Sequence, residues 1–230
     1  MRKLVPTLAL WLAVGLSGLQ AACAAEEAVS IPVAAVDNPK ADGGPQTAVL
    51  AGGCFWGIQG VFEHVRGVHQ VLSGYAGGKK DTAQYETVSG GNTGHAESVQ
   101  ITFDPKEVSY GELLRVYFSV AHDPTQLNRQ GPDSGTQYRS SIFYADETQK
   151  KIALAYIAQL DQAHLYRGKI VTRVDPLPGF YPAENYHQDY LVHNPSQPYI
   201  VINDLPKILH LKQTLPEMYV GRPVLVAASR

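Results

Sequence analysis

The residue best suited to chemistry is Cys54, in the run Gly-Gly-Cys-Phe-Trp-Gly at 52–57. An apolar run at 47–51 precedes it, and apolar residues at helical spacing follow it. A thiol where a strand passes into a helix meets unpaired backbone N–H groups and the positive end of the helix dipole, which favour the thiolate. The alternative is a small buried apolar residue, the commoner fate of a free cysteine. We predict a catalytic thiol with a lowered pKa and no partner cysteine.

Two large aromatic residues, Phe55 and Trp56, follow the thiol directly. Neighbours on a helix rarely both face the core, so one of them is expected to line a pocket beside Cys54. An apolar slot next to a nucleophile suits a small alkyl group. Spacing alone allows an equally simple interpretation, in which both rings belong to the core.

A carboxyl group occupies the apolar face of a predicted strand. Alternation over 97–103 places Glu97 on the same face as Val99, Ile101 and Phe103. Burial raises the pKa of a carboxyl group, so Glu97 is predicted to hold a proton near neutrality and to act as a general acid facing Cys54. The alternative is a glutamate at the strand end that turns to solvent.

A long polar stretch without periodicity covers 121–138 and carries Asp123, Asp133 and Tyr138, with Arg139 next to it. Such a stretch inside a compact domain is usually functional or disordered. No histidine is placed by motif beside Cys54, so a Cys/His nucleophile pair has no support. The eight histidines are scattered without zinc-type spacing, and we predict no metal site.

Composition predicts one domain without an electrostatic partner. The chain has 230 residues, of which 44% are hydrophobic and 17% charged, enough for one sizeable core. A formal net charge of -2 gives no reason to expect nucleic acid or an anionic membrane as partner.

The first 25 residues read as a signal peptide that is removed, with Arg2 and Lys3 before an apolar stretch at 4–19 and small residues at 21–25. A membrane anchor is disfavoured because the stretch is short and contains Pro6. We therefore expect an exported, periplasmic protein. In the alternative, Cys23 is lipid-modified and anchors a lipoprotein.

The positions of the predicted elements favour an α+β fold. Residues 26–46 read as a flexible lead-in, and 47–230 as a single catalytic domain. We expect strands at 47–51, 68–75, 97–103, 140–144 and 169–174, and helices from Cys54 to about Gly67 and at 110–120, 148–164 and 205–215. Ser109 and Glu112 form a capping box before the second of these helices. The expected architecture is a two-layer α/β sandwich, a ferredoxin-like mixed sheet with helices and long irregular loops.

Taken in order, five short motifs resemble those of the type A peptide methionine sulfoxide reductases. They are Gly-Cys-Phe-Trp-Gly at 53–57, Gly-His-Ala-Glu at 94–97, His-Asp-Pro-Thr at 122–125, Gln-Tyr-Arg-Ser at 137–140 and Asn-Tyr-His-Gln-Asp-Tyr-Leu at 185–191. The resemblance runs from about Thr47 to beyond Leu191. It implies reduction of the S epimer of methionine sulfoxide, free or in proteins, to methionine, leaving a cysteine sulfenic acid.

The resemblance also implies a role for each matching residue. Cys54 would attack the sulfoxide sulfur, and Glu97 would protonate its oxygen. Tyr85 and Tyr138 would hold that oxygen, with Asp133 as the site carboxylate near them. Phe55 and Trp56 would hold the S-methyl group, and Tyr186 and His187 would complete the substrate-binding residues.

The sequence departs from the family pattern in its cysteines. Many members carry a resolving cysteine near the C-terminus, whereas no cysteine follows Cys54 here. We therefore expect an external reductant, either a small thiol, a glutaredoxin-like protein or a thioredoxin-like dithiol. We also expect no bound cofactor, and nothing in the sequence calls for more than a monomer. Rival interpretations are a thiol peroxidase or hydrolase, and a non-catalytic relative that only binds oxidised proteins.

Overall fold

A six-stranded mixed sheet forms the centre of the molecule, in a computed structural model that describes residues 26–38, 40 and 43–226. The predicted signal peptide, with Cys23, lies outside these residues. The strands are β1 (Gln46–Ala51), β2 (Val68–Ala76), β3 (Ala96–Phe103), β6 (Ser141–Tyr144), β7 (Arg173–Pro176) and β8 (Phe180–Pro182). Their order is β7-β6-β1-β3-β2-β8, and only the β6–β7 pair is parallel. The β6-β1-β3-β2 part has the strand order of a ferredoxin-like fold, as predicted.

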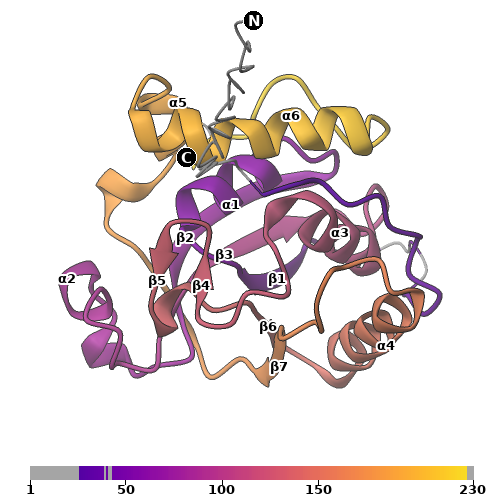
Figure 1. Ribbon diagram of the computed structural model, residues 1–230, viewed down its shortest axis with the longest axis horizontal. Coiled ribbons are helices and arrows are strands. Elements are labelled where there is room, and N and C mark those ends of the chain that lie inside the picture. Colours follow the sequence, from indigo (N-terminus) through magenta and orange to yellow (C-terminus); the bar gives the residue numbers. More distant parts are fainter. Residues whose placement is uncertain (1–25, 39, 41–42, 227–230) are drawn as a thin grey trace, which may run out of the picture.

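Helices cover one face of this sheet. They include α1 (Phe55–Glu63), α3 (Tyr110–Val116) and α4 (Glu147–Ala163), while α6 (Leu205–Thr214) packs on α1, and the short α2 (Tyr85–Val88) and α5 (Tyr190–His193) lie at the periphery (Figure 1). Alternation along the strands gives each face its own apolar cluster: Leu50, Val99 and Ile101 face the main core, and Val49 and Ala51 face a smaller cluster behind the sheet. The expected α+β sandwich is confirmed.

Several element boundaries differ from those predicted. The helix expected over 110–120 is α-helical to Val116 and continues as a π turn over Tyr117–Ala121. The strand expected at 169–174 pairs with β6 only from Arg173 onward, because the Val171 N–H donates to the Pro124 carbonyl instead. The stretch at 175–190, where no helix or strand was predicted, contains β8 and a 3₁₀ turn over Asn185–His187. The polar stretch at 121–138 contains a small hairpin formed by β4 (Arg129–Gln130) and β5 (Asp133–Ser134).

The predicted flexible lead-in differs most from what the structure contains. Residues 26–38, here called the strap, run across the helical layer toward α3 and α4 (Figure 1). Ile31 is buried in the main core, and the Val29 N–H donates to the Ser119 carbonyl at 2.9 Å. The Tyr156 hydroxyl donates to the Pro32 carbonyl at 2.6 Å, and the Gly111 N–H donates to Asp37 at 2.9 Å. Composition pointed to flexibility, but these tertiary contacts fix an extended chain that has no periodicity of its own.

The C-terminal segment, residues 219–226, is likewise fastened to the domain. Tyr219 forms a bridge with Val65, and the Val220 N–H donates to the His64 carbonyl. Beyond it, the Val226 N–H reaches both carboxylate oxygens of Asp189 at 3.1 Å. The segment therefore joins the end of α1 to the turn before α5. Within the described part of the chain, no helix combines the length and apolar character needed to cross a membrane.

Candidate functional site

Two glycines place the thiol where β1 ends and α1 begins. Gly53 has φ of +100°, and a Cβ there would lie 2.6 Å from Cβ of Gln130. A Cβ on Gly52 would lie 2.9 Å from the His122 ring. Only glycine therefore fits the sharp turn and the close approach of the β4–β5 region. Cys54 is the N-cap of α1, and its side chain makes no cap hydrogen bond.

The thiol opens into a cavity of about 200 Å³ that collects residues from distant parts of the chain. Its lining is Cys54, Phe55, Trp56, Tyr85, Glu97, Asp133, Tyr138 and Tyr199. All five side chains predicted to be catalytic, and both predicted for the methyl slot, meet there. Strand β3, the start of α2, the β4–β5 hairpin and the 3₁₀ turn over Thr136–Tyr138 each bring at least one of them to Cys54.

Glu97 is only 2% exposed and lies on the core-facing side of β3. The Phe55 N–H donates to its Oε2 at 3.1 Å, which ties the carboxyl to the first residue of α1. Burial raises the pKa of Glu97 to about 8, against the lowering effect of the Phe55 N–H and with help from Asp133 and Asp204. This carboxyl group is consequently protonated at neutral pH and can donate a proton into the cavity.

The predicted low pKa of Cys54 is wrong. Burial raises the pKa of the thiol well above its ordinary value, and the nearby Glu97 and Asp204 carboxyls raise it further. The Trp56 backbone N–H acts in the opposite direction, as expected at a helix N-terminus, but it does not outweigh burial. The helix end does favour the thiolate, but the desolvation imposed by the assembled fold outweighs it.

The two tyrosines offer protonated hydroxyls to the cavity. Burial raises the pKa of Tyr85 and of Tyr138, with Glu97 contributing to both, so each remains a hydrogen-bond donor at neutral pH. Glu184 holds Tyr85 in place by accepting from its backbone N–H at 3.0 Å. The other Glu184 oxygen accepts from the Tyr75 hydroxyl at 2.9 Å. Glu184 was not singled out from the sequence.

Trp56 is held rigidly as a wall of the cavity. Its ring stacks on Tyr190 with centroids 3.8 Å apart and planes inclined by 9°. Its Nε1–H donates to Nδ1 of His187 at 3.1 Å. His187 is buried behind Trp56 and Phe55 and does not line the cavity, so it supports the wall. Tyr186 is 61% exposed and also lies outside the lining.

Three residues that sequence reasoning missed complete the surroundings. Tyr199 lines the cavity, and its hydroxyl donates to Asp133. Asp204 is 1% exposed beside Gly57, and burial raises its pKa to about 7 although Lys207 opposes this. Tyr199 and Asp204 precede α6 and the third, Lys207, lies in its first turn, a region that the apolar pattern shows only as an ordinary helix. Nothing in their spacing marks them as neighbours of Cys54.

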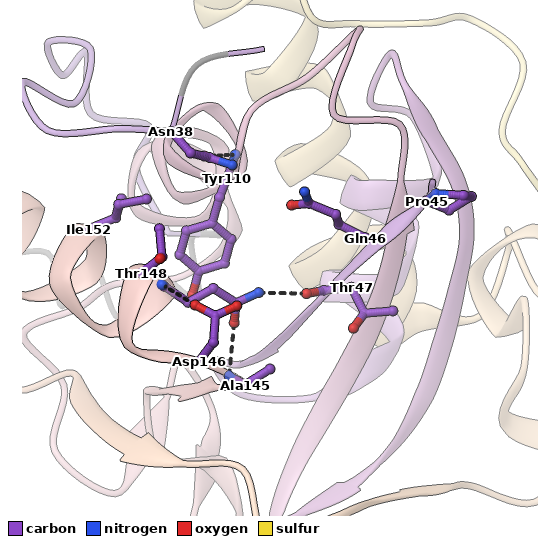
Figure 2. A pocket seen from close by; sticks show the side chains of 10 residues that line it. Asn38, Pro45, Gln46, Thr47, Tyr110, Ala145, Asp146, Thr148 and Ile152 are labelled. Atoms are coloured by element: carbon purple, nitrogen blue, oxygen red, sulfur yellow. Dashed lines mark hydrogen bonds between the residues drawn. The ribbon is translucent and has the colours of Figure 1, made fainter. Parts of the chain in front are cut away.

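A larger cavity elsewhere holds none of the predicted site residues. It measures about 430 Å³ and lies among the end of the strap, β1 and α4, with Asn38, Thr47 and Asp146 in its wall (Figure 2). The Gln149 side chain in that wall donates to the Thr47 carbonyl at 2.8 Å and tethers α4 to β1. Its lining contains no thiol, and its polar groups serve the fold.

Metal ligands and a second thiol do not gather at the site in the described residues. Over that part of the chain, no group of three or more His, Cys, Asp or Glu side chains is arranged to hold a metal ion. The same residues contain Cys54 as a free cysteine and no other.

Comparison with known proteins identifies the family. The family described as "Peptide methionine sulfoxide reductase" matches residues 46–218. The protein named "Peptide methionine sulfoxide reductase MsrA 2" of Mesorhizobium japonicum is 64% identical over 192 residues, 84% of this chain and 98% of that protein. Its namesake from Synechocystis is 54% identical over 170 residues, 74% of this chain and 79% of that protein.

Solved structures of the family also resemble the fold. Reduced Mxr1 of Saccharomyces cerevisiae gives a TM-score of 0.61 at 34% identity, covering 68% of this chain and 90% of that one. Methionine sulfoxide reductase A of Corynebacterium diphtheriae gives 0.58 at 34% identity, covering 74% of this chain and 89% of that one. A buried acid and a lone thiol in one aromatic cavity thus belong to a chain that is a member of the peptide methionine sulfoxide reductase family, oxidoreductases acting on sulfur.

Proposed function

We propose that this enzyme reduces the S epimer of methionine sulfoxide by direct attack of Cys54 on sulfur, with Glu97 as the acid. The observation that carries the proposal is the shared cavity, in which the thiol meets a carboxyl group that burial keeps protonated at neutral pH. A sulfoxide oxygen leaves only after protonation, so a thiol and a neutral acid facing one space match the needs of the reaction.

The chemical step balances with these two groups. Glu97 gives its proton to the sulfoxide oxygen as the Cys54 thiolate attacks the substrate sulfur and forms an S–S bond. The hydroxyl then passes to the Cys54 sulfur while the bond to methionine breaks. Methionine leaves, Cys54 becomes a sulfenic acid, and the proton lost by the thiol restores Glu97. The substrate sulfur gains the electron pair that the Cys54 sulfur gives up.

The walls of the cavity account for substrate choice. The faces of Phe55 and Trp56 provide an apolar surface for the S-methyl group. The hydroxyls of Tyr85 and Tyr138, kept protonated by burial, can donate to the sulfoxide oxygen. We propose that a methyl slot on one side, oxygen donors on the other and attack by Cys54 from a third direction together select one configuration at sulfur.

Regeneration is proposed to come from outside. Cys54 is the only cysteine in the part of the chain that the structure describes, so the sulfenic acid meets no neighbouring thiol there. A reductant thiol attacks Cys54, water leaves and a mixed disulfide forms. A second thiol then releases Cys54 and leaves the reductant as a disulfide. A thioredoxin-like dithiol supplies both thiols in one molecule, and the proposed exported location calls for a periplasmic counterpart.

Stereospecific turnover tests the proposal. The purified protein and Cys54→Ser are given each epimer of methionine sulfoxide, free and in a peptide, with a dithiol. We expect the wild type to reduce the S epimer alone and the variant to be inactive. Reduction of the R epimer only, or activity that survives in Cys54→Ser, would overturn the assignment. Hydroperoxide in place of sulfoxide serves as the control, since faster turnover of it would favour a thiol peroxidase.

A further inference from the structure

Lys207 is the only buried lysine in the described part of the chain. It lies in the first turn of α6 and is 6% exposed. Its ammonium group is 3.3 Å from Oε2 of Glu26 in the strap, and both side chains of this pair are shielded from water. Asp204, one turn earlier, is also buried, and its carboxylate oxygens have no hydrogen-bond partner. Lysine is almost never buried unless its charge is used or paired.

The thiol site lies directly beyond a shared wall. Asp133 and Tyr199 line the Cys54 cavity, and they also line a small second cavity together with Glu26 and Lys207. The hydrogen bond from Tyr199 to Asp133 closes this wall. Lys207 therefore contributes its charge from behind the site without entering the substrate cavity.

To attack sulfur, Cys54 must become a negatively charged thiolate in a site whose other ionisable groups are acids. The ionisable groups that face Cys54 are Glu97, Asp204, Asp133 and three tyrosines, and none of them brings a positive charge. The other buried cation, Arg139, donates to the backbone carbonyls of Gly94, His95 and Thr136. A thiolate in a buried, acidic site needs a nearby cation, because an unpaired buried charge is strongly disfavoured.

Lys207 keeps its charge despite its burial. Burial acts to lower the pKa of Lys207, but Glu26 and Asp204 together outweigh it and raise the pKa. The groups around the ammonium are Glu26, Asp204, Asp133, His122 and Cys54. Burial lowers the pKa of His122 to about 3, so His122 is neutral and adds no positive charge.

We propose that Lys207 is a positioning residue that stabilises the Cys54 thiolate, and that Glu26 of the strap holds the Lys207 ammonium in place and keeps it charged. This inference rests on the proposed role of Cys54 as the attacking thiolate. It makes the strap part of the catalytic apparatus, because Glu26 maintains the cation that lies behind the thiol cavity.

The ionisation of Cys54 tests the proposal independently of turnover. The full chain is alkylated with iodoacetamide across a pH series, and the rate is read by mass spectrometry of the peptide that contains Cys54. Lys207→Met is expected to raise the pH of half-maximal alkylation by about one unit, a tenfold loss of thiolate at a given pH. Lys207→Arg retains the charge and should stay near the wild type. Glu26→Gln removes the principal partner that keeps Lys207 charged, so it should shift the midpoint in the same direction, to higher pH, but by less.

A large shift to higher pH in Lys207→Met and a smaller one in Glu26→Gln support the proposal. An unmoved midpoint in folded Lys207→Met overturns it, even if turnover falls. If Lys207→Met does not fold, the Glu26→Gln/Lys207→Met double variant removes both members of the ion pair. The proposal is also overturned if the pH of half-maximal alkylation in that double variant equals that of the wild type and Glu26→Gln shows no shift. A wild type that ionises as expected but reduces no sulfoxide would refute the proposed function instead.

Discussion

Replacing Glu97 by glutamine is expected to give a protein that is inactive and more stable. The amide has nearly the same shape, and its oxygen can still accept from the Phe55 N–H. It has no acidic proton to give to a sulfoxide oxygen, so loss of this general acid should lower kcat/KM by about 10²- to 10⁴-fold. The same change removes a carboxyl group that the fold holds in its uncharged form.

The gain in stability follows from linkage. The pKa of Glu97 is about 8 in the folded chain, against an ordinary value of 4.5. The stabilising contribution of the protonated group is therefore fully present below pH 4.5, and it is lost as the pH rises through 8. The loss amounts to about 1.4 kcal/mol per pH unit between these values, or about 3 kcal/mol at pH 7. Glutamine does not ionise, so the variant should escape this loss.

Urea unfolding of the wild type and Glu97→Gln from pH 5 to pH 9 measures the difference in free energy of unfolding. It should be small at pH 5, grow with pH and level off above pH 8. Glu107→Gln, an amide substitution at an exposed position, is the matched control for charge loss without burial. A Glu97→Gln variant that is no more stable at pH 8, or whose advantage does not change with pH, would refute the view that burial holds Glu97 protonated. Retained activity would refute its role as the acid.

Three further changes test the frame around the site. Gly53→Ala should destabilise the protein by about 1–3 kcal/mol in thermal or urea unfolding and should lower turnover, because φ of +100° and contact with Gln130 both oppose a Cβ. Unchanged turnover would show that the thiol does not depend on this turn. Glu63→Gln should raise stability at pH 8 but not at pH 4, since burial, with Asp189 nearby, raises the pKa of Glu63 to about 9. Unfolding curves of the variant and the wild type that coincide at both pH values would count against this prediction. Ser109→Ala should cost about 0.5–2 kcal/mol by removing the cap of α3, with sulfoxide turnover unchanged.

What the sequence could predict depended on periodicity and on local turns. Alternation along β3 placed Glu97 on the core side, and the capping box at Ser109 marked the start of α3. The family resemblance implied Tyr85 and Tyr138, of which only Tyr138 lies in one of the five motifs. Spacing alone could not have placed either of them, because both come from short elements far from Cys54 in the chain.

What could not be predicted arises from long-range packing. Tyr199 reaches the cavity because α6 docks on α1, a contact for which no local pattern exists. The strap has no periodicity because its backbone bonds to other elements and not to itself. The pKa of Cys54 was misjudged for the same reason, since desolvation is a property of the assembled fold and not of a helix end.

The fastening of residues 219–226 has a consequence for the catalytic cycle. Joined to Val65, His64 and Asp189, these residues are held against the domain. In the proposed cycle, a reductant would then distinguish the oxidised from the reduced enzyme by the oxygen on Cys54. Under the proposed regeneration by an outside thiol, the second half of the cycle is a bimolecular encounter, and its rate depends on the concentration of the reductant.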